Sequence, residues 1–207
     1  MISEIGVQVG APGFEDPVLG PQQTFGAILE AMARPGQPVK IKSNLYIPKI
    51  LNPASAAVCL TLLDHETPLW TDLSWNSAAI NWFQFHCECS VVTEPCMAHF
   101  ALITQPANMP PLDDFKLGNE GYPISATTLI VQAERFNGHN GKILSGPGIK
   151  TTTYFAPGGI STQFWEQWQR QAALFPLGVD VFFTYNNMLA ALPRTTRVSD
   201  PNLQLDN

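Results

Sequence analysis

Two arginines and two threonines lie together near the end of the sequence, in the segment Pro193-Arg194-Thr195-Thr196-Arg197. A guanidinium group donates paired hydrogen bonds that match phosphate-type oxygens, and neighbouring hydroxyl groups can complete such a site. The segment follows an apolar stretch that we expect to be a strand. It indicates either an anion site on Arg194 and Arg197 or an exposed segment whose charges are solvated.

Two further turn-rich segments lie beside expected strands: Leu144-Ser145-Gly146-Pro147-Gly148-Ile149 and Phe175-Pro176-Leu177-Gly178-Val179-Asp180. Backbone N–H groups in the first could form an anion-binding nest, although glycine is also the usual residue of a plain turn between strands. Loops at strand ends are where α/β proteins place ligands. The candidate residues of this anion site are Ser145, Gly146, Gly148, Arg194 and Arg197.

No segment of the chain has the pattern of a metal motif, a phosphate-binding P-loop or a nucleophile elbow, so we assign no catalytic residue. Cysteines and histidines do gather at His86-Cys87-Glu88-Cys89 and Cys96-Met97-Ala98-His99. Their spacing, C-x-C-x6-C-x2-H, lacks the paired C-x2-C units of structural zinc sites. We therefore interpret Cys87, Cys89 and Cys96 as buried or partly buried free thiols, and we predict no metal site.

Two other groups of residues could support chemistry. The Asp64 and Glu66 carboxylates flank His65 and could share a metal or a proton, or they could form a solvated loop after a helix. Lys150 lies in a glycine- and threonine-rich loop, as a Schiff-base lysine could. No convincing set of cofactor-anchoring residues surrounds Lys150, so we predict no cofactor.

The composition indicates a globular protein. The chain has 207 residues, of which 45% are apolar, and this is enough for one domain with a buried core. We expect residues 1–207 to form a single α/β domain, with an irregular lead-in over residues 1–20 and a tail over residues 199–207. Only 14% of the residues are charged, which suggests that a partner covers part of the surface.

The charge and hydropathy of the chain exclude several classes of partner. A net charge of −6 argues against non-specific binding to nucleic acid or to an anionic membrane. No apolar run approaches the roughly 18–20 residues that cross a bilayer. The first residues lack the basic start and apolar core of a signal peptide, so we expect a cytoplasmic protein.

Periodicity and capping residues position the expected elements. Asn52-Pro53 is a clear helix start, and Ser161 or Thr162 begins another helix. A helix capped by Thr24 would turn Phe25, Ile28, Leu29 and Met32 to the core, and helical periodicity recurs at 76–86. Strands are expected at 39–42, 69–71, 100–103, 127–131, 151–155, 179–183 and 189–192. The alternation predicts a layered α/β/α sandwich with a mixed sheet.

Taken in order, eight segments resemble the PhnH family, whose members are subunits of the bacterial carbon–phosphorus lyase core complex. They extend from about residue 14 to residue 198. The segments lie at 24–36, 60–70, 85–86, 98–101, 126–130, 144–149, 175–180 and 193–196. Two features depart from the family pattern: Gly26 replaces a basic residue, and Cys87, Cys89 and Cys96 have no counterpart.

The resemblance implies a fold similar to that of pyridoxal-phosphate-dependent transferases, as a homodimer without the cofactor. It also implies an accessory, non-catalytic role in making ribose 1-alkylphosphonate 5-triphosphate from ATP and an alkylphosphonate. The implied partners are PhnG, PhnI and PhnJ, with ATP or an alkylphosphonate as the candidate ligand. Two alternatives stay open: a pyridoxal-phosphate-type transferase using Lys150, and a stand-alone nucleotide- or phosphonate-binding protein.

Overall fold

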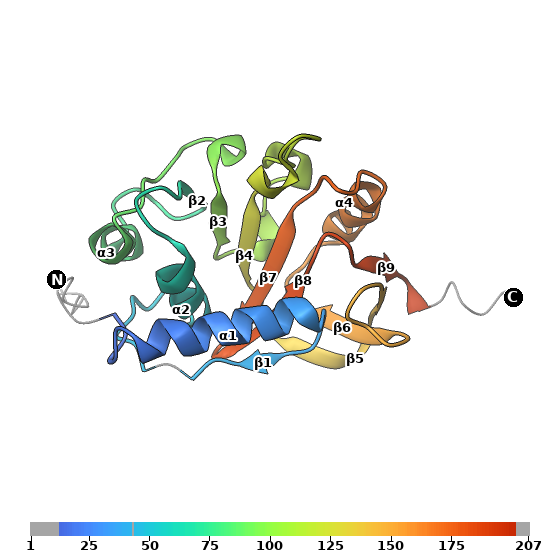
Figure 1. Ribbon diagram of the computed structural model, residues 1–207, viewed down its shortest axis with the longest axis horizontal. Helices are drawn as coiled ribbons and strands as arrows, with labels where there is room; N and C mark the ends of the chain where they lie inside the picture. The colour runs from blue at the N-terminus through green and yellow to red at the C-terminus, as the bar shows by residue number, and fades with distance from the viewer. Residues whose placement is uncertain (1–12, 43, 202–207) are drawn as a thin grey trace, which may run out of the picture.

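A six-stranded mixed sheet forms the centre of the molecule, with the strand order β1-β8-β7-β4-β3-β2 (Figure 1). The structure, a computed structural model, describes residues 13–42 and 44–201, and only the backbone of residues 137–140. Strands β2, β3, β4 and β7 are parallel, whereas β8 is antiparallel to both of its neighbours. The strands are β1 (Val39–Lys40), β2 (Leu69–Thr71), β3 (Phe100–Ile103), β4 (Thr128–Gln132), β7 (Asp180–Tyr185) and β8 (Met188–Leu192).

Both faces of this sheet are buried, because successive side chains of a strand point to opposite faces. In β4, Ile130 belongs to one hydrophobic core, whereas Leu129 and Val131 belong to the other. In β7, Phe182 and Phe183 divide in the same way. The sheet thus separates two apolar layers. Its parallel and antiparallel strand pairs confirm the expected mixed sheet.

Three helices cover the first face: α1 (Leu19–Ala33), α2 (Pro53–Leu62) and α3 (Ala78–Cys87). The predicted start of α2 is confirmed, because the Asn52 side chain accepts a hydrogen bond from the N–H of Ser55 and Pro53 is the first helical residue. Ser77 caps α3 in the same way, through the N–H of Ile80.

The predicted start of α1 is wrong by six residues, because the N-cap is Val18 and not Thr24. The helix begins at Leu19, after Asp16, whose carboxylate accepts hydrogen bonds from the N–H groups of Val18 and Leu19 at 2.8 Å each. The irregular lead-in therefore ends before residue 20. Thr24 lies inside the helix, and its hydroxyl donates to the carbonyl of Gly20.

The buried face of α1 also differs from the expected one. Thr24, Ile28 and Ala31 face the core, whereas Phe25 and Leu29 are 47% and 54% exposed. The earlier start of α1 does not change which residues share a face of the helix. The error lies instead in the choice of the face that contacts the sheet. Ala31 is fully buried, and α1 packs against β8.

The second face is covered by α4 (Thr162–Ala172) and by a small antiparallel sheet. Ser161 caps α4 as predicted, and Phe164, Trp165 and Trp168 are buried. The outer layer is therefore not purely helical, which corrects the simple α/β/α description. The small sheet has the order β6-β5-β9, with β5 (Phe136–Ser145), β6 (Thr153–Pro157) and β9 (Arg197–Ser199).

Short 3₁₀ turns make up much of the remaining connections. They are η1 (Pro95–Met97), η2 (Pro106–Asn108), η3 (Leu112–Asp114) and η4 (Pro123–Ser125). The last three replace a crossover helix between β3 and β4, and η3 contributes the buried Leu112 to the second core. In the part of the chain that is described, no helix has the length and apolarity to cross a membrane.

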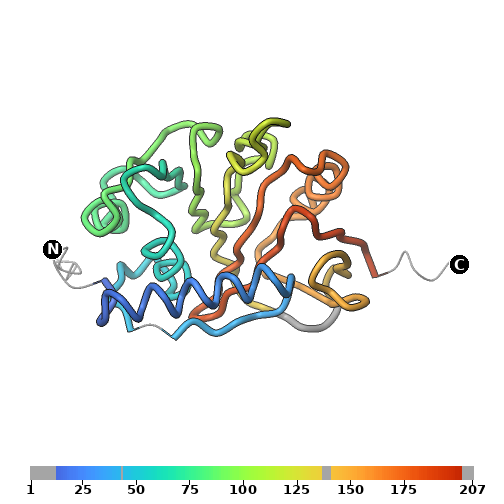
Figure 2. The backbone as a smooth tube through the Cα atoms, viewed as in Figure 1, coloured from blue at the N-terminus to red at the C-terminus, as the bar shows by residue number. Residues whose placement is uncertain are grey.

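Segments from early and late in the sequence lie side by side (Figure 2). Strand β1 pairs with β8, and the N–H of Gly36 donates to the carbonyl of Ala191 at 2.9 Å. Helix α1 packs on the same strand. The edge of the central sheet is thus completed by the first segments of the fold.

Candidate functional site

The three turn-rich segments of the sequence meet around one pocket of about 580 Å³, which we call the arginine pocket. It lies where β5 and β8 end and where β7 and β9 begin. The sequence prediction grouped residues of the first and last segments as one anion site, and the structure brings four of those residues together with Phe175 of the remaining segment. The pocket is lined by Ser145, Gly146, Pro147, Ala172, Phe175, Arg194, Thr195 and Arg197.

Strand pairing explains why these segments converge. Ser145, the last residue of β5, is paired with Arg197, the first residue of β9. Gly146 follows with a φ of 127°, and a Cβ at this position would lie 3.0 Å from the carbonyl oxygen of Thr195. Only glycine fits this close approach without strain. The turn then closes through the N–H of Ile149, which donates to the carbonyl of Gly146.

Arg194 is engaged with the protein itself. Its guanidinium contacts the Asp180 carboxylate through Nη2 at 2.5 Å and through Nε at 3.2 Å, and the pair is largely buried. Its Nη1 also donates to the carbonyl of Pro123 at 3.0 Å. The predicted anion ligand Arg194 therefore forms one wall of the pocket and has few donors left for a ligand.

Arg197 is the more available cation of the arginine pocket. Its side chain is exposed, and none of the described carboxylates lies within ion-pair distance of it. Gly148, in contrast, lies outside the pocket lining, because a Cβ there would be 2.3 Å from the carbonyl oxygen of Ala33 at the end of α1. Four of the five predicted residues thus share one pocket.

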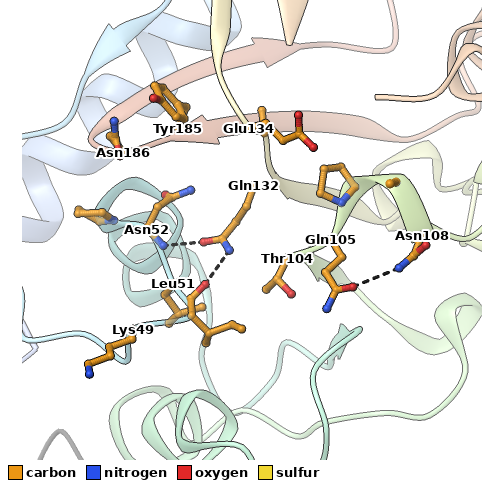
Figure 3. Close-up of a pocket in the computed structure, with 15 residues that line it drawn as sticks. Lys49, Leu51, Asn52, Thr104, Gln105, Asn108, Gln132, Glu134, Tyr185 and Asn186 are labelled. Carbon is orange, nitrogen blue, oxygen red and sulfur yellow. Dashed lines mark hydrogen bonds between the residues drawn. The ribbon is translucent and has the colours of Figure 1, made fainter. Parts of the chain in front are cut away.

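A second pocket, of about 590 Å³, lies at the opposite edge of the sheet, where the parallel strands β3, β4 and β7 end (Figure 3). We call it the carboxyl-edge pocket. This edge is where open α/β sheets usually bind ligands. It is lined by Lys49, Ile50, Leu51, Asn52, Pro53, Thr104, Gln105, Pro106, Ala107, Asn108, Gln132, Ala133, Glu134, Tyr185 and Asn186.

Gln132 holds the floor of the carboxyl-edge pocket together. Its Oε1 accepts hydrogen bonds from the N–H of Asn52 and the hydroxyl of Ser55, both at 2.6 Å. Its Nε2 donates to the carbonyl of Ile50 at 2.9 Å, as Figure 3 shows. The N–H of Ala54 donates to Asn186, so the first N–H groups of α2 are used within the protein. This helix end therefore offers no ready anion site.

Sequence reasoning missed the carboxyl-edge pocket because its residues come from four distant segments. The usable signal was a polar residue directly after each apolar strand: Asp72 after β2, Thr104 after β3 and Gln132 at the end of β4. Asp72 accepts hydrogen bonds from the N–H groups of Thr104 and Gln105 and from the hydroxyl of Thr104. These residues align the ends of neighbouring strands.

The other sequence candidates lie outside both pockets. Asp64, His65 and Glu66 are exposed, and the carboxylate of Asp64 accepts the N–H of Glu66 within a local turn. Lys150 is exposed in the loop between β5 and β6. Across the described ranges, no three histidine, cysteine or acidic side chains are grouped so as to hold a metal ion.

A model of the family described as "Bacterial phosphonate metabolism protein (PhnH)" matches residues 12–199. The chain belongs to the PhnH family. The resemblance seen in the ordered sequence segments is thus confirmed, and the match includes every residue that lines the two pockets.

Two relatives of this PhnH family member extend the comparison. The chain is 36% identical over 192 residues to "Alpha-D-ribose 1-methylphosphonate 5-triphosphate synthase subunit PhnH" of Rhizobium meliloti (strain 1021), which covers 92% of this chain and 96% of the relative. It is 33% identical over 84 residues to "Putative C-P lyase subunit protein HtxG" of Stutzerimonas stutzeri, which covers 41% and 43% of the two chains.

The cysteines are free thiols as predicted, but the prediction that Cys96 is buried or partly buried is wrong. Cys59, Cys87 and Cys89 are buried, and Cys96 is exposed. Burial, with the neighbouring thiol of Cys89, raises the pKa of Cys87 to about 12. Burial also raises the pKa of Cys89 to about 11. The folded state thus favours neutral thiols, and this contribution to stability is present below the unfolded pKa and is lost as pH rises toward the folded values.

We expect Asp180→Ala to lower the free energy of unfolding by about 3 kcal/mol, because it leaves the guanidinium of Arg194 buried without its carboxylate. Urea denaturation measures the change. Arg197→Ala is the control, and its effect should stay within about 0.5 kcal/mol because the side chain is exposed. Equal effects of the two substitutions would contradict the structural role of the Asp180–Arg194 pair.

We also expect the free energy of unfolding to fall as pH rises from about 8 to about 10, partly because Cys87 ionises only in the unfolded chain. Replacing it, in Cys87→Ala, should remove about 1 kcal/mol of this fall. Cys96→Ala, at an exposed thiol, provides the control and should leave the slope unchanged. Urea denaturation at both pH values gives the comparison, and identical slopes in the two variants would rule out the burial argument.

Proposed function

We propose that the chain is a subunit of an enzyme complex that makes α-D-ribose 1-methylphosphonate 5-triphosphate during phosphonate metabolism. The observation that carries this proposal is the 36% identity to a synthase subunit over 92% of this chain and 96% of that protein. An end-to-end match of this kind transfers the role of a whole subunit rather than that of one domain. The proposed partners are PhnG, PhnI and PhnJ, with the chain present as a homodimer.

Within such a complex we propose an accessory role rather than a catalytic one. In support, the polar side chains that would be the first candidates for chemistry join elements of the fold instead. Arg194 binds Asp180, Gln132 binds the start of α2, and Asp72 binds the end of β3. These contacts suit a subunit that binds, positions or assembles. A fold kinship with pyridoxal-phosphate-dependent transferases and a cytoplasmic location stay predictions.

We propose further that the arginine pocket receives an anionic group, such as the phosphate of ATP or an alkylphosphonate. In support, Arg197 is exposed, and Ser145 and Gly146 line the same pocket. Hydrogen bonds from a guanidinium to such oxygens are charge-assisted and therefore strong. Arg194, held by Asp180, would fix the wall against which the anion lies, and Arg197 would supply the positive charge.

The assembly proposal is tested by co-expressing the tagged chain with PhnG, PhnI and PhnJ of the same bacterium. We expect a stable complex to survive affinity purification and gel filtration. The matched control is an unrelated tagged protein of similar size expressed with the same PhnG, PhnI and PhnJ. A chain that elutes alone in the presence of all its own partners would contradict the proposed subunit role.

For the arginine pocket, we expect Arg197→Ala to weaken binding of ATP or methylphosphonate by about tenfold, since it removes charge-assisted hydrogen bonds of roughly 1.5 kcal/mol. Arg170→Ala is the control, because Arg170 is also exposed but lies on α4 outside the pocket lining. Equilibrium dialysis with each compound measures the affinities. An unchanged affinity in Arg197→Ala, or no binding by the unsubstituted chain, would overturn this part of the proposal.

A further inference from the structure

The carboxyl-edge pocket presents polar groups that keep donors or acceptors for a ligand. Glu134 follows β4, Tyr185 ends β7, and Gln105 and Asn108 follow β3. Figure 3 shows Gln105 and Asn108 across the pocket from Asn52 and Gln132. Three adjacent strands thus bring a carboxylate, a phenol and two amides to one concave surface, which is the usual form of a small-molecule site.

The backbone fixes the position of Glu134. Its N–H donates to the carbonyl of Gly158 at 3.0 Å, and the N–H of Gly158 donates to the carbonyl of Arg135 at 2.9 Å. Gly159 lies so close that a Cβ there would be 3.0 Å from Cγ of Glu134. The two glycines therefore make room for the acidic side chain at the mouth of the pocket. A larger residue at 159 would displace it.

The carboxylate of Glu134 remains available to a ligand. Its ion pair with Arg135 spans 3.6 Å, and both side chains are 59% exposed. Exposed pairs of this kind contribute little free energy and exchange readily with other partners. The one other charged side chain that lines the pocket within the described residues is Lys49, so the lining has no net charge. This balance does not favour a phosphate group.

The amides and the phenol complement the carboxylate. Oε1 of Gln105 accepts a hydrogen bond from Nδ2 of Asn108 at 3.1 Å, which leaves Nε2 of Gln105 as a donor and Oδ1 of Asn108 as an acceptor. Asp72 holds this segment by accepting the N–H of Gln105 at 2.8 Å. The Tyr185 hydroxyl makes no hydrogen bond to another described residue, and its ring contacts Phe136.

We propose that the carboxyl-edge pocket binds the vicinal hydroxyl groups of a ribosyl compound, with Glu134 as their acceptor. A carboxylate has lone pairs for two hydroxyl donors. An acidic residue in this position, beyond the carboxyl end of a parallel strand, binds ribose hydroxyls in dinucleotide-binding folds. The volume of about 590 Å³ suits a small molecule of nucleoside size.

This site differs from the arginine pocket in place and in chemistry. The arginine pocket presents two guanidinium groups near the amino end of β7. The carboxyl-edge pocket, at the other edge of the sheet, presents amides, a phenol, one carboxylate and one lysine, with no net charge. Binding of a diol is argued from this chain's own residues. Only the identification of that diol with a substrate of the synthase rests on the proposed function.

Binding of adenosine, uridine and 2′,3′-dideoxyadenosine to the full chain tests the proposal, with line broadening in ligand-observed NMR as the measurement. Adenosine and uridine should bind with similar affinity, because the sugar is recognised. The dideoxy compound should bind at least about tenfold more weakly, since it has lost both charge-assisted hydrogen bonds. Glu134→Gln should weaken adenosine binding by a similar factor.

Glu166→Gln provides the matched control, because Glu166 is an exposed acidic residue on α4 outside the pocket. Equal binding of adenosine and its dideoxy analogue, unchanged affinity in Glu134→Gln, or no binding of adenosine would each overturn the proposal. The assembly experiment is independent of these outcomes. If the chain assembles with its partners but does not bind the diol, the proposed function stands and this site is refuted. If the chain binds the diol but does not assemble, the site stands and the proposed function is refuted.

Discussion

The ion pair between Asp180 and Arg194 is the contact on which the amino edge of the sheet depends. It joins the first residue of β7 to the segment that leaves β8, and the same carboxylate accepts the backbone N–H of Arg194. Through the carbonyls of Pro123 and Pro176, the guanidinium also ties two irregular segments to that edge. A charge pair buried in this way is favourable only if its hydrogen bonds are satisfied, and here they are.

The two edges of the sheet have different construction. At the carboxyl edge, neutral amides and one carboxylate link strand ends and the start of α2, through Gln132, Asn52 and Asp72. At the amino edge, the Asp180–Arg194 ion pair links the start of β7 to the segment after β8. The side chains that remain available are balanced in charge at the carboxyl edge, where Glu134 and Lys49 line the pocket, and cationic at the amino edge, where Arg197 is exposed. The two edges therefore suit different ligand groups, an anion at the amino edge and a polar group without net charge at the carboxyl edge.

Capping residues and apolar β-branched runs in the sequence predicted many of the helices and strands. Asn52-Pro53 and Ser161 define helix starts, and the apolar β-branched run of 128–131 defines a central strand. The start of α1 could not be read so directly, because Gly20 and Pro21 lie in its first turns and resemble a loop. Sequence reasoning also named four residues of the arginine pocket, but not the partnership of Arg194 with Asp180. Such a pairing depends on tertiary geometry, which spacing does not reveal.

The pairing of β1 with β8, and of β5 with β9, has a consequence for how the chain folds during its synthesis. Strand β1 emerges early from the ribosome, yet its partner begins only at residue 188, and β9 follows at residue 197. Contacts so distant in sequence form slowly and late. Until then α1 has no strand β8 to cover, and the nascent chain exposes apolar surface that chaperones could recognise.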